Sequence, residues 1–196
     1  GHRTAVDPRA HFVQGNLADA TTLDAAIAKA KPEGIIHFAA FIEVGESMKL
    51  PGKYFANNVG NGINLAEAAV KHGVRKIVFS STAAVYGMPK HIPITEAEAK
   101  QPINAYGESK LMFEKILGWF HDLKDLQYTA LRYFNAAGAT EKYGEDHNPE
   151  THLIPLIMQA AEGKREKISV FGTDYDTPDG TCIRDYIHVL DLAQAH

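Results

Sequence analysis

Short apolar segments rich in β-branched residues alternate along the chain with segments of helical periodicity. The apolar segments, which we expect to form strands, are residues 10–14, 34–40, 76–81, 128–135 and 167–172. The segments with helical spacing are residues 21–31, 53–72, 105–123 and 153–162. Nearly unbroken apolar strands that alternate with helices are typical of a parallel sheet covered on both faces. The pattern therefore predicts an α/β fold.

Two of the expected helices carry apolar stripes that we interpret as their buried faces. The stripes are Val59, Ile63, Ala66 and Val70 in the first helix, and Met112, Ile116, Trp119, Phe120 and Leu123 in the second. Gly60 and Gly62 lie inside the first helix, where glycine allows another helix to pack closely. After about Tyr143 the chain changes to acidic, proline-bearing loops around a short helix. This change predicts a domain boundary between residues 143 and 144, with the start of a smaller substrate-side lobe after it.

Composition excludes several classes of protein. The 196 residues include 20 Lys and Arg against 24 Asp and Glu, a net charge of −4, and 45% of them are hydrophobic. The chain is too apolar to be disordered, and its excess of acid argues against a nucleic-acid partner. No apolar run reaches the roughly 18 residues of a membrane span. With one cysteine, Cys182, and no secretory signal pattern, we expect a cytoplasmic protein.

Polar residues cluster where a strand ends and a helix begins. The strand of residues 76–81 runs into Thr82, and the helix from residue 105 opens with Tyr106 and Lys110, which share one helical face. A nearby ammonium and a second positive group lower the pKa of a tyrosine, ordinarily near 10. With Thr82 sharing a hydrogen bond, this set is suited to move a proton while a hydride leaves carbon. A half-buried Tyr beside an exposed Lys is the non-catalytic alternative, and the pair lies away from the Met112 stripe.

Four segments resemble the extended short-chain dehydrogenase/reductase family, and within it the UDP-sugar 4-epimerases. They are SSTAAVYG (80–87), YGESK (106–110), RYFNAAG (132–138) and DYDTPDGTCIRDYIHVLDLA (174–193). The resemblance covers essentially the whole chain. It implies a Rossmann-like, doubly wound sheet that binds NAD, followed by part of a nucleotide-sugar lobe. It also implies an isomerase of galactose metabolism that takes a UDP-sugar as substrate and is usually a homodimer joined through the helices of residues 53–72 and 105–123.

The resemblance also implies roles for individual residues. Tyr106 is the base, Lys110 holds the nicotinamide ribose and lowers the tyrosine pKa, and Thr82 bonds the sugar 4-hydroxyl. The implied NAD contacts are Asn16, Leu17, Phe38, Ala39, Ala40, Phe41, Ile42, Asn57, Thr82, Tyr106, Lys110 and Phe134. The implied substrate contacts are Thr82, Tyr106, Asn135, His152, Leu153, Ser169, Val170, Phe171 and Arg184. Relatives commonly have Asp for Asn16, some have Lys for Ile42, and many have Asn for His152, so contacts at these positions carry less weight.

Three features of the sequence bear on the ligand and the reaction. A guanidinium suits a diphosphate, so Arg184 fits the substrate role, with an ion pair to Asp185 as the alternative. Ala83 and Ala84 replace the Asp-Glu of nucleotide-sugar dehydratases, which favours epimerisation because methyl groups move no protons. The cluster Glu145, Asp146, His147 and His152 matches no zinc spacing, so we expect no metal.

A glycine-rich phosphate-binding turn is missing from the sequence. In the strand order 3-2-1-4-5-6 the first strand is central, between the segments 10–14 and 34–40. We therefore expect that this chain belongs to a longer polypeptide, is completed by another chain, or is marginally folded alone. A fragment without catalysis, or a cofactor-free binding module, is the rival interpretation.

Overall fold

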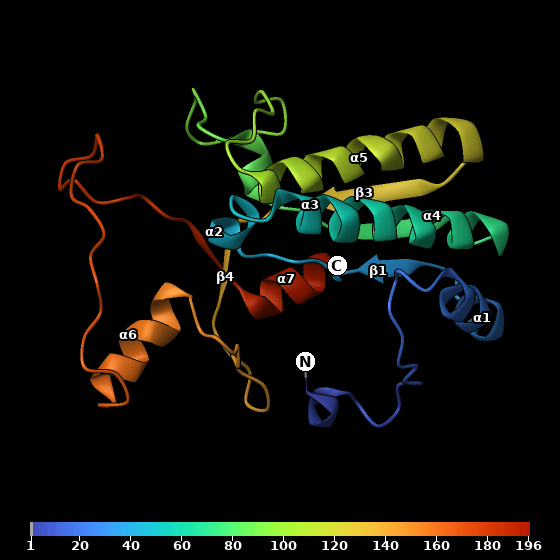
Figure 1. Ribbon diagram of the computed structural model, residues 1–196, viewed down its shortest axis with the longest axis horizontal. Helices are drawn as coiled ribbons and strands as arrows, with labels where there is room; N and C mark the ends of the chain where they lie inside the picture. Colours follow the sequence, from blue (N-terminus) through green and yellow to red (C-terminus); the bar gives the residue numbers. More distant parts are fainter. Residues whose placement is uncertain (1) are drawn as a thin grey trace. The chain divides into compact units, whose positions relative to one another are not determined.

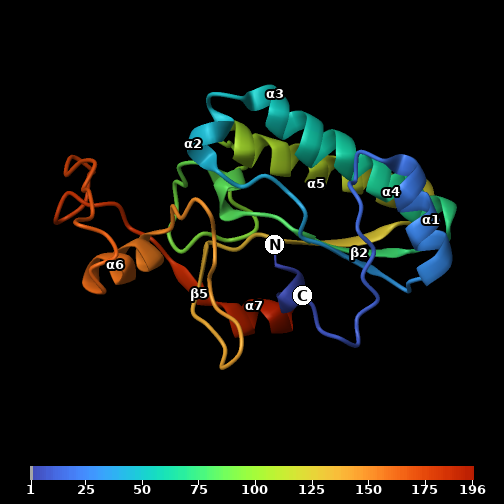
Figure 2. The ribbon, with the colours of Figure 1, turned by 60° about the horizontal axis from the view of Figure 1, so that its bottom comes forward.

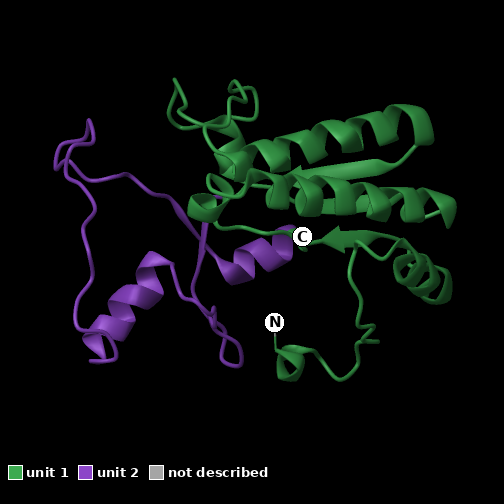
Figure 3. Ribbon diagram, viewed as in Figure 1, with its two compact units in different colours: residues 1–133, 196 green, residues 134–195 purple. Residues whose placement is uncertain are grey.

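A computed structural model describes residues 2–196, which form two compact units (Figures 1 and 3). Unit 1 comprises the chain up to Tyr133 together with His196, and unit 2 is Phe134–Ala195. The expected boundary between residues 143 and 144 separates a cofactor-binding part from a sugar-binding part. It stays a prediction. Within the described residues, no helix is both long and apolar enough to cross a membrane.

Unit 1 contains a three-stranded sheet and most of the helices. Its elements are η1 (Arg3–Ala5), α1 (Ala20–Ala30), β1 (Ile35–His37), α2 (Val44–Ser47), α3 (Pro51–Tyr54), η2 (Phe55–Gly60), α4 (Asn61–Lys71), β2 (Lys76–Ser80), η3 (Ala83–Tyr86), α5 (Ala105–Lys124) and β3 (Gln127–Leu131). The strands are parallel in the order β1-β2-β3, with Ile36 opposite Val78 and Val78 opposite Thr129. The alternation of strands and helices confirms the predicted α/β fold.

Helices α4 and α5 lie on one face of this sheet (Figure 2). Ile77 and Phe79 of β2 point to that face and pack in one core with Phe113 and Leu117 of α5. The alternate row belongs to the opposite face, and Ile36 in it is 52% exposed. Within unit 1, the predicted cover of helices is therefore seen on one face of the sheet.

The buried faces of two helices differ from the predicted stripes. In α5 the buried side chains include Lys110, Phe113, Glu114 and Leu117. Of the predicted stripe, Ile116 and Phe120 are partly buried against this core, whereas Trp119 is 66% exposed. The face of Tyr106 and Lys110 thus points toward the core. Counting apolar side chains did not find this buried face, because polar side chains can also be buried when they have hydrogen-bond partners.

In the first predicted helix, the buried row lies one position before the predicted stripe. Residues 53–72 form α3, a π-helical turn η2 and α4 in place of a single α-helix. The deeply buried row is Tyr54, Asn58, Gly62, Leu65 and Ala69, and Ala66 is the fully buried member of the predicted stripe. A polar residue and a glycine inside the buried row hid it from a count of apolar side chains.

Two predicted strands, residues 10–14 and 167–172, are wrong. Both segments are exposed, and neither pairs with another strand in the part of the chain that the structure describes. A strand needs a hydrogen-bonded neighbour, so an apolar run without one stays irregular. The single strand predicted over residues 128–135 is instead divided between β3 and the next strand, β4.

Unit 2 is a small parallel pair of strands with two helices and long loops. Its elements are β4 (Asn135–Ala137), α6 (Leu153–Ala161), β5 (Tyr186–His188) and α7 (Val189–Ala195). Asn135 pairs with Tyr186, and both its backbone N–H (3.2 Å) and its side-chain amide (2.7 Å) donate to the Asp185 carbonyl. The predicted helix of residues 153–162 is confirmed as α6, whereas β5 and α7 were not predicted.

Gly62 lets α4 approach α5, which generates a stability prediction. A Cβ at Gly62 would lie 2.6 Å from the ring of the fully buried Phe113, whereas one at Gly60 meets nothing within 4 Å. We expect Gly62→Ala to lower the free energy of unfolding by about 1–3 kcal/mol through overpacking. Gly60→Ala is the matched control and should be neutral or stabilising by up to about 1 kcal/mol, since alanine favours helix. Urea unfolding of both variants checks this, and equal losses would contradict the packing.

Buried His37 generates a pH prediction. Burial, with the nearby positive charge of Lys110 as the smaller cause, lowers the His37 pKa from 6.5 to about 4. The folded protein holds the ring neutral while the unfolded chain protonates it near 6.5. The stabilisation is therefore complete above pH 6.5 and is lost as pH falls toward 4, by up to about 3 kcal/mol. We expect His37→Gln to show a shallower fall of unfolding free energy between pH 6.5 and 4 than the parent; parallel curves would refute this origin.

Candidate functional site

The candidate site lies where β2 ends and α5 begins. Asn104 caps α5, accepting a hydrogen bond from the Gly107 backbone N–H at 2.8 Å. A Cβ at Gly107 would lie 2.8 Å from the Ala84 carbonyl oxygen, so only glycine permits this close approach of α5 to η3. The approach brings Tyr106, next to Gly107, up to Thr82.

The Thr82 side chain lies close enough to the Tyr106 phenol to lower the pKa of that phenol through hydrogen bonding. The Thr82 oxygen accepts from the Ala84 N–H at 3.1 Å, so its own O–H is available to donate to the phenolic oxygen. Burial raises the pKa of Tyr106, the Thr82 hydrogen bond opposes this rise, and the neighbouring Tyr133 adds to it. Within this structure the phenol is therefore a weaker acid than an exposed tyrosine.

Lys110 is buried under the same turn of α5. Its ammonium donates to the Ser80 carbonyl at 2.7 Å and lies 5.9 Å from the centre of the Tyr106 ring. Burial lowers the Lys110 pKa to about 8, so the group remains mainly charged at neutral pH. The hydrogen bond to Ser80 occupies one of three N–H donors. The structure thus brings together the three residues predicted to be catalytic.

A second buried network stands beside these residues and was missed in the sequence. Glu114 accepts from the Arg132 guanidinium at both oxygens, with distances of 2.6 and 2.9 Å for the two shortest contacts, and from the Ser81 hydroxyl. Arg132 also donates to the Tyr86 hydroxyl at 2.9 Å. Glu114 follows Lys110 by four residues, so the same helical spacing that paired Tyr106 with Lys110 places all three on one face.

Loop 38–42, which follows β1 and was predicted to bind the cofactor, is held by Asn58. The Asn58 side chain accepts from the Phe41 N–H at 2.9 Å and donates to the Phe41 carbonyl at 3.0 Å. The predicted contact Asn57 is half-buried and bonds Asn58 and Asn61 through its side chain. Phe38 and Ile42 are exposed on the loop.

Other predicted cofactor residues in unit 1 have local structural roles. Exposed Asn16 accepts from the Ala18 N–H at 2.9 Å, and Leu17 packs against the core and accepts from Asn64 at 3.0 Å through its carbonyl. Loop residues Ala39 and Ala40 lie between Phe38 and Phe41. The contacts of these residues with a cofactor stay predictions.

The remaining predicted residues belong to unit 2 and are exposed. They are Phe134, Asn135, His152, Leu153, Ser169, Val170, Phe171 and Arg184. The Phe171 ring is 99% exposed. Arg184 donates to the Ile183 carbonyl at 2.8 Å, and the alternative ion pair with Asp185 is not formed among the described residues. The NAD contact of Phe134 and the nucleotide-sugar contacts of the other residues stay predictions.

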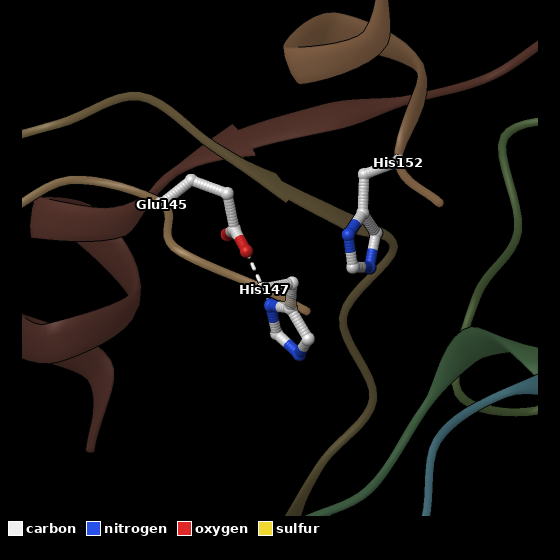
Figure 4. A group of neighbouring side chains, drawn as sticks. All are labelled: Glu145, His147 and His152. Atoms are coloured by element: carbon white, nitrogen blue, oxygen red, sulfur yellow. Dashed lines mark hydrogen bonds and ion pairs between the residues drawn. The ribbon is translucent and has the colours of Figure 1, made fainter. Parts of the chain in front are cut away.

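Three exposed side chains of unit 2, Glu145, His147 and His152, gather with ligand atoms within 4.8 Å of one another (Figure 4). Glu145 contacts Nδ1 of His147, and Glu150 contacts Nδ1 of His152 at 2.8 Å. The glutamates therefore provide partners for both rings, and the expectation that no metal binds stays a prediction.

Comparison with known proteins matches the whole chain to one family. The sequence profile of the NAD dependent epimerase/dehydratase family matches residues 1–196. The UDP-glucose 4-epimerase of Lacticaseibacillus casei is 54% identical over 198 residues, a match that covers 100% of this chain and 60% of that protein. That of Streptococcus mutans is 54% identical over 200 residues, with the same coverage. The chain thus spans about 60% of the length of these curated relatives.

Solved structures of similar sequence have the same fold as this chain. UDP-glucose 4-epimerase from Brucella ovis in complex with NAD has a TM-score of 0.96 and 49% identity, covering 100% of this chain and 61% of its own. The enzyme from Bifidobacterium longum in complex with NAD+ and UDP has a TM-score of 0.89 and 42% identity, covering 94% and 56%.

The Glu114–Arg132 pair generates a prediction about the framework of the site. Glu114→Gln keeps the side-chain shape but leaves the mostly buried Arg132 without a counter-charge. We expect it to lower the free energy of unfolding by about 3 kcal/mol. Glu67→Gln, at an exposed position of α4, is the matched control and should stay within about 0.5 kcal/mol of the parent. Urea unfolding checks both, and a neutral Glu114→Gln would show that the pair contributes little.

Proposed function

Since the chain belongs to the NAD dependent epimerase/dehydratase family, we propose that the protein carrying it is a UDP-glucose 4-epimerase. It would interconvert UDP-galactose and UDP-glucose through a 4-keto intermediate. The observation that carries this proposal is the set of Thr82, Tyr106 and Lys110, with two alanines directly after Thr82. Ala83 and Ala84 carry only methyl groups, so no further acid or base stands there to expel water from the sugar.

The side chains of the site fit the nicotinamide end of NAD. A buried ammonium with N–H donors to spare, next to a phenol, suits ribose hydroxyls and a reacting carbinol. NAD, when bound, supplies the hydride acceptor and donor at C4 of the sugar. Lys110 would bind the ribose, and loop 38–42 with Asn57 would contact the same cofactor. A NAD-bound relative of 49% identity supports this assignment.

The residues of the chain divide the proton transfer between them. When the substrate binds, the single Thr82 O–H would turn from the phenolic oxygen to the sugar 4-oxygen, and Tyr106 would take the 4-hydroxyl proton as hydride leaves C4. Return of hydride to the other face of C4 requires the same proton back from Tyr106, so one group serves as base and then as acid. Because burial raises the Tyr106 pKa, the phenolate needs nearby positive charge, which the ammonium of Lys110 contributes.

We place the UDP-sugar contacts of the proposal in unit 2, at Asn135, His152, Leu153, Ser169, Val170, Phe171 and Arg184. The exposed guanidinium of Arg184 suits a diphosphate because it offers paired donors. The same proposal includes the cytoplasm as the location of the enzyme, which agrees with a single free cysteine.

We propose a homodimer in which α5 contributes to the interface. Met112, Trp119 and Leu123 form a row on α5, and Trp119 and Leu123 are 66% and 69% exposed. Packing in the core of unit 1 therefore does not account for these two side chains. An exposed apolar row of this kind is typical of a surface that a partner covers.

The experiment that tests the function uses the full-length protein. It should purify with NAD and convert UDP-galactose to UDP-glucose. Tyr106→Phe should lower kcat by a factor of about 10³ or more while NAD stays bound, because it removes the proton acceptor. Tyr128→Phe, a partly exposed tyrosine of β3, is the control and should keep the parent rate. A 4-keto-6-deoxy product, or an undiminished rate in Tyr106→Phe, would overturn the assignment.

A further inference from the structure

Asn58 has no role in the proposed chemistry, yet its side-chain amide is buried and fully hydrogen-bonded. The oxygen accepts from the Phe41 N–H (2.9 Å) and from the Asn57 amide (3.0 Å). The nitrogen donates to the Phe41 carbonyl and to the Ser109 hydroxyl, each at 3.0 Å. Four bonds use both donors and both acceptor positions of the amide. Because all four hydrogen-bonding positions are occupied, the orientation of the Asn58 amide and its partners are fixed.

The partners of Asn58 come from two segments that are distant in the sequence. Phe41 lies in loop 38–42, and Ser109 lies in α5 between Tyr106 and Lys110. The Ser109 hydroxyl, fully buried, in turn donates to the Tyr106 carbonyl at 2.7 Å. One continuous chain of hydrogen bonds therefore runs from the loop through Asn58 and Ser109 to the backbone of the tyrosine. Because Asn58 bonds both the N–H and the carbonyl of Phe41, it holds the loop as a neighbouring strand would.

The helix is locally altered where Asn58 stands. Residues Phe55–Gly60 form a π-helical turn, η2, between α3 and α4. Turns of this kind add a residue to a helix and occur frequently at functional sites. The Asn58 amide satisfies the backbone of a loop that has no strand beside it at Phe41. A larger apolar side chain would leave both polar groups of Phe41 without these partners.

We propose that Asn58 is a positioning residue that sets loop 38–42 against the Tyr106–Lys110 turn, and that it thereby controls both NAD retention and the rate of the chemical step. This inference rests on the proposed function for the identity of the cofactor. Asn58 acts through Phe41 and Ser109 and is assigned no contact with NAD or sugar. Breaking this series of hydrogen bonds should let loop 38–42 and Tyr106 move independently. The residues of unit 2 that we propose to contact the sugar should keep their structure.

Two serines allow a matched test of this chain of hydrogen bonds. Ser109 and Ser47 are both fully buried, and each donates to the carbonyl three residues earlier at 2.7 Å. Only Ser109 also accepts from Asn58. Ser109→Ala therefore interrupts the hydrogen bonds between loop 38–42 and Tyr106. Ser47→Ala removes a similar local hydroxyl of α2 and leaves those hydrogen bonds intact.

In the full-length protein, we expect Ser109→Ala to release NAD about tenfold faster and to lower kcat about tenfold, with the KM for UDP-galactose little changed; a tenfold change corresponds to about 1.4 kcal/mol, the net contribution of one hydrogen bond. Ser47→Ala should match the parent in NAD release and kcat. NAD release is followed by dilution into a cofactor-free buffer, and urea unfolding records any loss of stability in both variants.

Asn58→Ala and the double variant complete the test. If Asn58 and Ser109 act as one unit, their effects on NAD release are not additive, because the first change has already cut the chain. Equal NAD release from Ser109→Ala and Ser47→Ala, or additive effects, would overturn the positioning role while leaving the epimerase proposal intact. A parent protein that retains NAD but fails to epimerise would overturn the proposed function, and the NAD-release comparison would still decide the role of Asn58.

Discussion

The hydrogen bond from the buried ammonium of Lys110 to the Ser80 carbonyl is the constraint on which the site depends. A buried charge is costly unless it is paired, so this contact and the Glu114–Arg132 pair determine which face of α5 turns toward the sheet. Both act on the carboxyl end of β2, at Ser80 and Ser81. Once this face is fixed, Tyr106 must lie over Thr82, because it precedes Lys110 by one helical turn.

Burial at this junction also sets the electrostatics of the proposed reaction. Desolvation lowers the Lys110 pKa to about 8 and raises that of Tyr106, so it favours the neutral form of both groups. The Thr82 hydrogen bond favours the phenolate and is the local compensation. The tyrosine therefore stays protonated near neutral pH until more positive charge stands close by. As the proposed base, Tyr106 would be activated by positive charge that binds beside it, and this suits the proposed reaction because NAD+ carries positive charge at its nicotinamide.

The sequence predicted those parts of the structure that depend on neighbours in the chain. The helix at residues 105–123 and the strand at 76–81 agree with α5 and β2 to within one residue, because periodicity and capping are local properties. Residues 10–14 were indistinguishable from a strand by composition, but pairing depends on a distant segment. The contact of Glu114 with Arg132, 18 residues away, likewise has no local sign. The proximity of Thr82, Tyr106 and Lys110 was therefore predictable, and the buried ion pair that supports them was not.

Asn58 shows why the buried face was misplaced and what would have located it. Tyr54, Asn58, Gly62 and Leu65 recur at intervals of four, four and three residues, which is the spacing of one helical face. An apolar count passes over this row because an amide and a glycine interrupt it. Yet a glycine on that row indicates close contact with another helix, and an amide on it must find buried partners. In this chain, a polar residue in phase with a glycine therefore marked the buried row that the count of apolar side chains had passed over.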